Sequence, residues 1–238
     1  MTGIRAKARL ETTNEIKRLA REQIASKGAA NLSLREIARE MGVASSALYR
    51  YFSSRDQLLT VLIIESYDDI GNMVERADAQ CSRNDLLGRW RAVSQSIRTW
   101  AIKNPSDYGL IFGTPVPGYE APTDTIAPAL RYTNVLLHLL ADIQAAGCAP
   151  LVNVPPTKGV SREYKRVRAN LEIKLADEMI LAGLAAWAAL FGAISFELFG
   201  HVDTAKIRSI LGWKPRDLDE MVTSMADSMI AHGIVRSK

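Results

Sequence analysis

The segment from residue 33 to residue 55, SLREIAREMGVASSALYRYFSSR, constrains the fold of this chain more than any other stretch. Its first apolar residues share one helical face at the i, i+3, i+4 and i+7 spacing: Leu34, Ile37, Ala38 and Met41. Ser33 precedes this face and Glu36 lies three residues later, a capping-box pattern that predicts the start of a helix. Gly42 can adopt the left-handed conformation that ends a helix. With a second short helix over residues 45–52, the segment is typical of a helix-turn-helix.

The second helix of this pair has a surface suited to nucleic acid. Leu48 and Phe52, at i and i+4, face the core, so the small and polar residues around them stay on other faces. A helix-turn-helix can place its second helix in the major groove of DNA, where small side chains let the backbone approach the bases. The candidate DNA-binding residues are Ser33, Arg35, Ser45, Ser46, Ala47, Tyr49, Arg50, Tyr51 and Arg55.

The expected roles of these residues differ. Arg35 lies on the exposed face of the first motif helix and suits a bidentate contact to guanine, although a solvated arginine is the alternative. Tyr49 and Tyr51 can hold phosphates or pack against the core. Arg55 begins the next helix, where its side chain and the helix N-terminus can share one phosphate. Ser33 is first of all a helix cap.

These residues carry a family resemblance. The sequence LREIAREMGVASSALYRYFSSRDQLL resembles the DNA-binding domain of the tetracycline-repressor (TetR) family of transcriptional regulators. The resemblance rests on the helix, the Gly-Val turn, the Leu-Tyr-x-Tyr-Phe order and a basic residue four positions after the second tyrosine, and it covers about the first 65 residues. It implies a three-helix DNA-binding domain in which Tyr49 and Tyr51 contact phosphates.

Charge and composition agree with this interpretation. Residues 1–57 contain 11 Lys and Arg against 6 Asp and Glu, whereas the remainder contains 19 against 20, so the basic excess lies with the helix-turn-helix. A chain of 238 residues with 47% hydrophobic content can bury a large core in one or two domains. Cys81 and Cys148 are the only cysteines. We therefore expect no structural metal, no cofactor, no membrane span and a cytoplasmic location.

The rest of the chain reads as helices. Residues 1–10 form a basic arm, either lying along DNA or simply solvated, and a first helix follows over residues 12–27. The sequence predicts a DNA-binding domain over residues 1–56 and a ligand-binding and dimerisation domain over residues 57–238, connected by a long helix that transmits changes in tilt. The further expected helices span residues 55–79, 84–103, 106–112, 126–146, 171–201 and 217–232. The fold class is all-α.

The second half also resembles a subclass of the same family. LIFGTPVPGYEAP and WAALFGAISFELFG are similar to the C-terminal domain named for a Trp-His-Gly signature, but Phe191-Gly192 stands where His-Gly is usual. The resemblance implies a homodimer whose last two long helices form a four-helix interface. The apolar surfaces of residues 171–201 and 217–232 exceed what one side of a bundle needs, and we expect Leu218 and Met225 to lie in that interface.

Aromatic residues accumulate in this second half, near the Pro- and Gly-rich loop over residues 113–122. Ordinary helix-bundle core is one explanation for each residue. An apolar pocket for a small molecule is the other. The candidate ligand-binding residues are Trp90, Trp100, Phe112, Tyr119, His138 and Trp187.

The sequence therefore predicts a ligand-responsive transcriptional regulator, most simply a repressor that a small apolar or amphipathic ligand releases from a palindromic operator. The alternatives are an activator, a corepressor-dependent regulator, or a helical-bundle enzyme or ligand carrier with an incidental helix-turn-helix. Catalytic motifs are missing from the sequence, which has no GxGxxG, no phosphate-binding loop and no HExxH. His138, His201 and His232 are isolated from one another. We expect no enzymatic activity.

Overall fold

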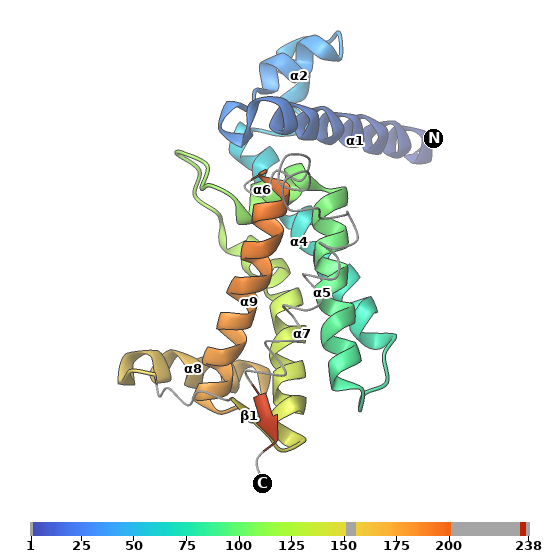
Figure 1. Ribbon diagram of the computed structural model, residues 1–238. Coiled ribbons are helices and arrows are strands. Elements are labelled where there is room, and N and C mark those ends of the chain that lie inside the picture. The colour runs from blue at the N-terminus through green and yellow to red at the C-terminus, as the bar shows by residue number, and fades with distance from the viewer. Residues whose placement is uncertain (1, 151–155, 201–233, 237–238) are drawn as a thin grey trace, which may run out of the picture. The chain divides into compact units, whose positions relative to one another are not determined.

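The computed structural model describes residues 2–150, 156–200 and 234–236. In these ranges the chain forms nine α-helices, and the expected all-α class is confirmed (Figure 1). The helices are α1 (Thr2–Lys27), α2 (Leu34–Glu40), α3 (Ser45–Leu48), α4 (Arg55–Ala79), α5 (Leu86–Lys103), α6 (Pro105–Phe112), α7 (Ile126–Ala145), α8 (Lys158–Leu171) and α9 (Asp177–Leu198). Two short strands, β1 (Cys148–Pro150) and β2 (Ile234–Arg236), pair antiparallel with Ala149 opposite Val235.

The chain divides into two compact units. Unit 1 comprises residues 1–69 and 104–129, and unit 2 comprises residues 70–103 and 130–238. Both α4 and α7 contribute residues to each unit. The functional boundary that the sequence places after residue 56 stays a prediction. The helix α6 and the loop after it pack within unit 1, which also contains the helix-turn-helix.

The helix-turn-helix of unit 1 forms as its sequence predicts. The Ser33 side chain accepts a hydrogen bond from the backbone N–H of Glu36 and thereby caps α2. At the other end Gly42 has a φ of 68°, and the N–H groups of Gly42 and Val43 bond to the carbonyls of Arg39 and Ala38 at 3.1 and 3.0 Å. This pair of bonds is a Schellman motif, which needs a residue without a Cβ at the left-handed position.

The core of unit 1 joins α1, α2, α3 and α4. Thirteen buried residues build it: Ile16, Leu19, Ala20, Ile24, Leu32, Leu34, Ile37, Ala38, Leu48, Phe52, Leu58, Leu59 and Leu62. The motif therefore rests on α1 and the first turns of α4.

Two expectations about helix bounds are wrong. Residues 2–10 were expected to form a mobile arm, but they continue α1, and the hydroxyls of Thr12 and Thr13 bond back to the carbonyls of Ala8 and Arg9 at 2.9 and 2.8 Å. The exposed residues 3–10 lack an apolar stripe, yet they are rich in Ala, Arg, Lys and Leu. These residue types have a high intrinsic helix propensity, which explains a helix that packs against little.

The second wrong expectation is a single helix over residues 171–201. The chain leaves the helix at Glu172, which has a φ of 54°, and re-enters it at Asp177. Tertiary contacts hold the break: Gln144 on α7 accepts the N–H of Ala176 at 2.7 Å, and Arg168 on α8 donates to the carbonyl of Leu175 at 3.2 Å and pairs with Asp177. The helix α8 (Lys158–Leu171), which precedes this break, is missing from the helices that the sequence predicts.

Unit 2 is a helical bundle in which ion pairs join the elements. Arg89 on α5 is almost fully buried and donates to Asp78 and Asp142, each at 2.7 Å, which ties α5 to the end of α4 and to α7. Arg98 on α5 is paired with Glu197 on α9 at 2.7 Å. A buried cation needs such partners, because its desolvation is costly.

The helix α9 is apolar over most of its length. By length and composition it could cross a membrane, a test that the core helix of a soluble protein also passes. It begins with Asp177 and Glu178, carries Glu197 in its last turn, and packs against α5, α7 and α8. These features are those of a bundle helix.

Candidate nucleic-acid interface and ligand cavity

The helix-turn-helix presents a polar and basic surface. Arg35, Ser46, Tyr49 and Arg50 are exposed, and the other candidate DNA-binding residues are half-buried: Ser33, Ser45, Ala47, Tyr51 and Arg55. The second motif helix is shorter than the expected residues 45–52. Regular helix ends at Leu48, and the N–H groups of Tyr51 and Phe52 then bond to its carbonyl at 2.8 and 3.0 Å. The chain thus keeps turning beyond the helix, which leaves Tyr49 and Arg50 on the surface.

Arg55 has a structural role that the sequence did not reveal. Its Nη2 donates to the carbonyls of Ala29 and Ala30 at 3.1 and 3.2 Å, and its Nη1 lies 3.7 Å from a carboxylate oxygen of Asp56. The guanidinium therefore anchors the short 3-10 turn Ala29–Asn31 to the start of α4. Only the guanidinium N–H groups that make none of these contacts remain available to bind a phosphate.

Arg9 is a functional candidate that sequence reasoning treated only as part of an arm. Its guanidinium lies 5.1 Å from the centre of the Tyr51 ring, and its Nη2 is 3.5 Å from the carbonyl of Arg50. The first contact is in the range of a cation–π interaction. Arg9 thus places a positive charge beside the residues that follow the second motif helix. The signal available in the sequence was the Arg5, Lys7, Arg9 run.

An ion-pair cluster in unit 1 joins α1, α4 and α6. Glu65 on α4 accepts from Lys17 and Arg21 on α1 at 2.6 and 3.0 Å, and Arg21 also pairs with Asp107 on α6 at 3.1 Å. Asp107 is buried. Partial desolvation and the negative charges of nearby carboxylates raise the pKa of Asp69, and Arg21 offsets part of this rise. The cluster fixes the position of α6 against the DNA-binding helices.

The loop after α6 packs on the same helices. The hydroxyls of Tyr119 and Thr60 are 2.9 Å apart, and Leu110, Val116 and Tyr119 pack against the core of unit 1. Phe112 contacts the rings of Tyr67 and Tyr108, with ring centres 6.2 and 5.1 Å apart. Two of the candidate ligand-binding residues, Phe112 and Tyr119, are therefore packing residues of unit 1.

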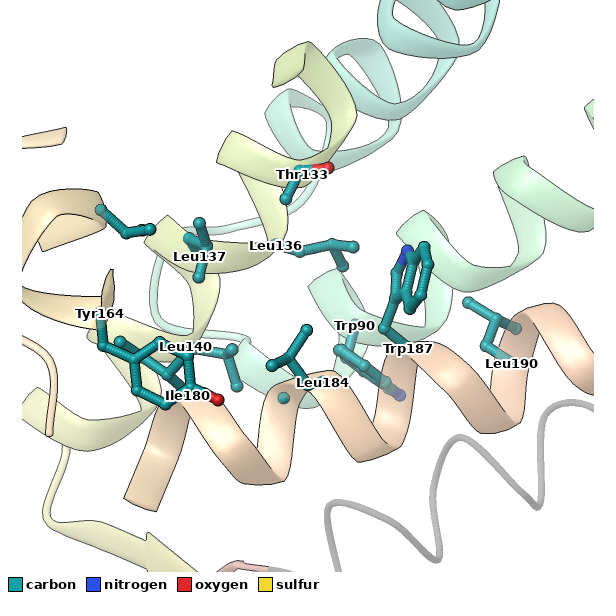
Figure 2. Close-up of a pocket in the computed structure, with 12 residues that line it drawn as sticks. Trp90, Thr133, Leu136, Leu137, Leu140, Tyr164, Ile180, Leu184, Trp187 and Leu190 are labelled. Carbon is teal, nitrogen blue, oxygen red and sulfur yellow. The ribbon is translucent and has the colours of Figure 1, made fainter. Parts of the chain in front are cut away.

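A cavity of about 230 Å³ lies within unit 2, between α5, α7, α8 and α9 (Figure 2). Twelve residues line it: Trp90, Thr133, Leu136, Leu137, Leu140, Tyr164, Val167, Ile180, Gly183, Leu184, Trp187 and Leu190. Trp90 and Trp187 are the two candidate ligand-binding residues that the structure brings to this cavity. Trp100 is buried but does not line the cavity. His138 lies exposed on α7 and does not line the cavity either.

The polar atoms around the cavity come from side chains without charge. Burial raises the pKa of Tyr132, and Thr133 and Trp187 lie near its hydroxyl. The indole Nε1 atoms of Trp90 and Trp187 are both buried and have no hydrogen-bond partner among the described residues. Leu136, Leu137, Leu140 and the other aliphatic lining residues could not have been assigned from the sequence, because a leucine stripe is the pattern of any bundle core.

The candidate dimer residues Leu218 and Met225 lie outside the described residues. Among the residues that the structure describes, no three His, Cys, Asp or Glu side chains come together as a metal site would require.

Comparisons with known proteins agree with this combination of a helix-turn-helix and a separate helical bundle. The family model described as "Bacterial regulatory proteins, tetR family" matches residues 16–62, and the one described as "Tetracyclin repressor-like, C-terminal domain" matches residues 90–229. The chain belongs to the TetR family of DNA-binding transcriptional regulators. The Trp-His-Gly subclass stays a prediction.

Several relatives are similar along most of their length. The chain is 37% identical over 200 residues to the HTH-type transcriptional regulator Rv1816 of Mycobacterium tuberculosis, covering 84% of this chain and 86% of that one. Among solved structures, the regulatory protein SCO4313 is 31% identical with a TM-score of 0.72, covering 95% of this chain and 98% of that one. A tetR family regulator from Shewanella sp. PV-4 shares the fold, with 18% identity and a TM-score of 0.61 over 94% and 98% of the two chains.

Proposed function

We propose that this TetR-family regulator is a cytoplasmic, dimeric repressor, which a small apolar ligand in the unit 2 cavity releases from a palindromic operator. The observation that carries the ligand-responsive part is the cavity itself. An empty apolar volume costs about 24 cal/mol per Å³ of stability, so a bundle with a purely structural role would be better filled with side chains. A chain with a helix-turn-helix in one unit and an unfilled cavity in the other has the two sites that regulation by a ligand needs.

The proposed mechanism is a shift between two arrangements of the same dimer. Ligand binding would favour the arrangement in which the two helix-turn-helix motifs no longer fit successive major grooves. The shift can be no larger than the difference in ligand affinity between the two arrangements. The proposed transmission element is α4, because it contributes residues to both units, and the Arg21–Asp107 and Tyr119–Thr60 contacts make α6 and its loop move with the DNA-binding helices.

Selection of random DNA fragments with the purified protein, followed by sequencing, tests the DNA-binding part. We expect enrichment of one inverted repeat, whose half-sites are one helical turn apart. Enrichment of no sequence would contradict a specific operator. Transcription in vitro from a promoter carrying the selected site then distinguishes repression from activation.

A cavity-filling variant tests the ligand-responsive part. Leu137 lines the cavity and is half-buried, so Leu137→Trp should fill part of the volume, raise the melting temperature and abolish the response to ligand. Binding to the selected operator should stay unchanged, because the substitution lies in unit 2. A variant that still responds to a copurified or added effector would place the ligand elsewhere.

A further inference from the structure

The lining of the unit 2 cavity restricts the chemistry of what can bind there. None of its twelve described lining residues is charged, and most are aliphatic or aromatic. An ion brought into such a lining would lose its hydration without gaining a partner of opposite charge. The cavity therefore favours an uncharged molecule. This argument rests on the function proposed above, because it concerns the same site.

The cavity is also lined by two indoles whose hydrogen-bond donors are unused. Trp90 is 3% exposed, and its buried indole N–H has no acceptor among the described residues. The buried indole N–H of Trp187 has no acceptor in hydrogen-bonding geometry either, although it lies near the hydroxyl of Tyr132. A buried donor without an acceptor is unfavourable, and a tryptophan N–H normally finds one. Each of the two indoles therefore has a hydrogen bond left to donate.

The volume sets the size of the occupant. A cavity of about 150 Å³ lined by aliphatic and aromatic side chains is known to hold benzene. The present volume of about 230 Å³ is larger. By proportion it accommodates roughly ten non-hydrogen atoms without rearrangement of the helices. Figure 2 shows the aliphatic lining from α7 and α9 and both indole rings around this space.

We propose that the cavity binds an uncharged, mostly apolar molecule of roughly ten non-hydrogen atoms that carries a hydrogen-bond acceptor, such as a ketone, and that one of the two indole N–H groups, of Trp90 or of Trp187, donates to this acceptor. Carboxylates of the same size are excluded by the uncharged lining. Hydrocarbons of the same size enter, but they leave both indole N–H groups unpaired and bind less tightly.

The experiment uses the full chain and matched probes of three skeletons, one linear, one bicyclic aromatic and one compact. The ketones are 2-nonanone, 1-tetralone and camphor, and each is compared with its hydrocarbon and with a carboxylate of similar size. Calorimetry and ligand-observed NMR give the affinities. We expect at least one ketone to bind about tenfold more tightly than its hydrocarbon, and the carboxylates to bind least.

Two variants assign the preference to one indole. One of the substitutions Trp90→Phe and Trp187→Phe should remove the tenfold ratio between ketone and hydrocarbon, and the other should preserve it. Equal binding of ketone and hydrocarbon in the wild type, an unchanged ratio in both variants, or tighter binding of the carboxylates would overturn the proposal while leaving a ligand site in place. Binding of no probe at all would instead remove the cavity as a ligand site, and with it the ligand-responsive part of the proposed function.

Discussion

Arg50 and Arg55 are both basic residues of the helix-turn-helix region, but their surroundings differ. Arg50 is exposed and its side chain has no hydrogen bond among the described residues, so its charge is available to a phosphate. Arg55 holds the carbonyls of Ala29 and Ala30. A loss of DNA binding in an Arg55 variant therefore has two possible causes, a lost phosphate contact and a displaced turn.

A paired substitution separates these causes. Arg50→Ala should leave the free energy of unfolding unchanged, and it should flatten the salt dependence of DNA binding by about one unit per half-site. Arg55→Ala should destabilise the protein by about 1–2 kcal/mol, since it removes hydrogen bonds from a charged donor to the half-buried carbonyl of Ala29 and the exposed carbonyl of Ala30. Chemical denaturation and binding titrations at several salt concentrations measure the two effects. An Arg55 variant of full stability would contradict the anchoring role.

The expected role of Arg35 differs from those of Arg50 and Arg55, because we expect Arg35 to contact a base. It is exposed near the start of α2, and the cap of that helix by Ser33 fixes its direction. Arg35→Ala should cost about 1–3 kcal/mol per half-site and relax the preference at one base pair. Repeating the DNA selection with the variant tests this. Recovery of the same motif at equal stringency would show that Arg35 is not a base reader.

For single residues, the sequence predicts those interactions whose two partners lie close together in the chain. The Ser33 cap and the left-handed Gly42 depend on neighbours a few residues away, so the pattern contains both ends of each interaction. Arg55 bonding to Ala29 and Arg9 stacking on Tyr51 join residues far apart in sequence. Their geometry depends on how α1 packs, which no local pattern encodes.

An ion-pair cluster joins the helices of unit 1, and several carboxylates of this cluster lie close enough to repel one another. Partial burial and the negative charges of nearby carboxylates raise the pKa of Asp69 above the ordinary value of 3.8, although the positive charge of Arg21 offsets part of this rise. The folded protein therefore holds the Asp69 proton more tightly than the unfolded chain does. Stability from this group is present at low pH and is lost as the pH rises through the raised pKa.

Asp69→Asn should remove this loss of stability at neutral pH. The variant should melt roughly 1–2 °C higher than the wild type at pH 7. This difference should vanish near pH 3, where Asp69 is protonated in both states. Glu120→Gln, which changes an exposed carboxylate of the same unit, is the control and should show no such trend. A variant that is less stable than the wild type at pH 7 would mean that the attraction of Arg21 dominates at this position.

The packing of α9 gives a second prediction for an element. A Cβ added at Gly183 would lie 2.2 Å from Cδ1 of Leu140 on α7, whereas a Cβ at Gly192 would meet nothing within 4 Å. The clashing atom is a terminal methyl group of a side chain that borders the cavity, so Gly183→Ala should cost at most about 1 kcal/mol and should lack the stabilisation expected of alanine in a helix. Gly192→Ala should stabilise the helix by about 0.5–1 kcal/mol. Thermal denaturation measures both, and equal effects of the two substitutions would contradict the close approach of α9 and α7.

Helix ends show what limits prediction at this scale. The bounds of α4 were predicted correctly, because capping, apolar periodicity and the final turn agree along Arg55–Ala79. The break between α8 and α9 was missed, because the apolar periodicity continues across residues 172–176. The break depends on Gln144 and Arg168, whose contacts with this segment exist only in the folded unit.

For the whole molecule, the described part of α9 has an apolar face that the described chain leaves exposed. Leu184, Phe196 and Phe199 are each about half exposed, and Phe196 is the most exposed of them at 55%. At about 100° per residue they fall within roughly a third of the helix circumference. Large apolar side chains gathered on one face of a helix are typical of a protein–protein interface. This exposed face supports the proposal that residues 171–201, which include α9, belong to the dimer interface.

Phe196→Lys should therefore weaken the dimer, because it places a charge in the centre of the proposed interface. Sedimentation at micromolar concentration should show a dimer for the wild type and a monomer for the variant. Binding to a palindromic operator should fall by about 100-fold or more, since the second half-site no longer adds avidity, while binding to an isolated half-site should stay the same. Ile102→Lys, at an exposed apolar residue of α5, is the control and should remain dimeric. A Phe196 variant that stays dimeric would place the interface on other residues, and a monomeric wild type would refute the dimeric regulator itself.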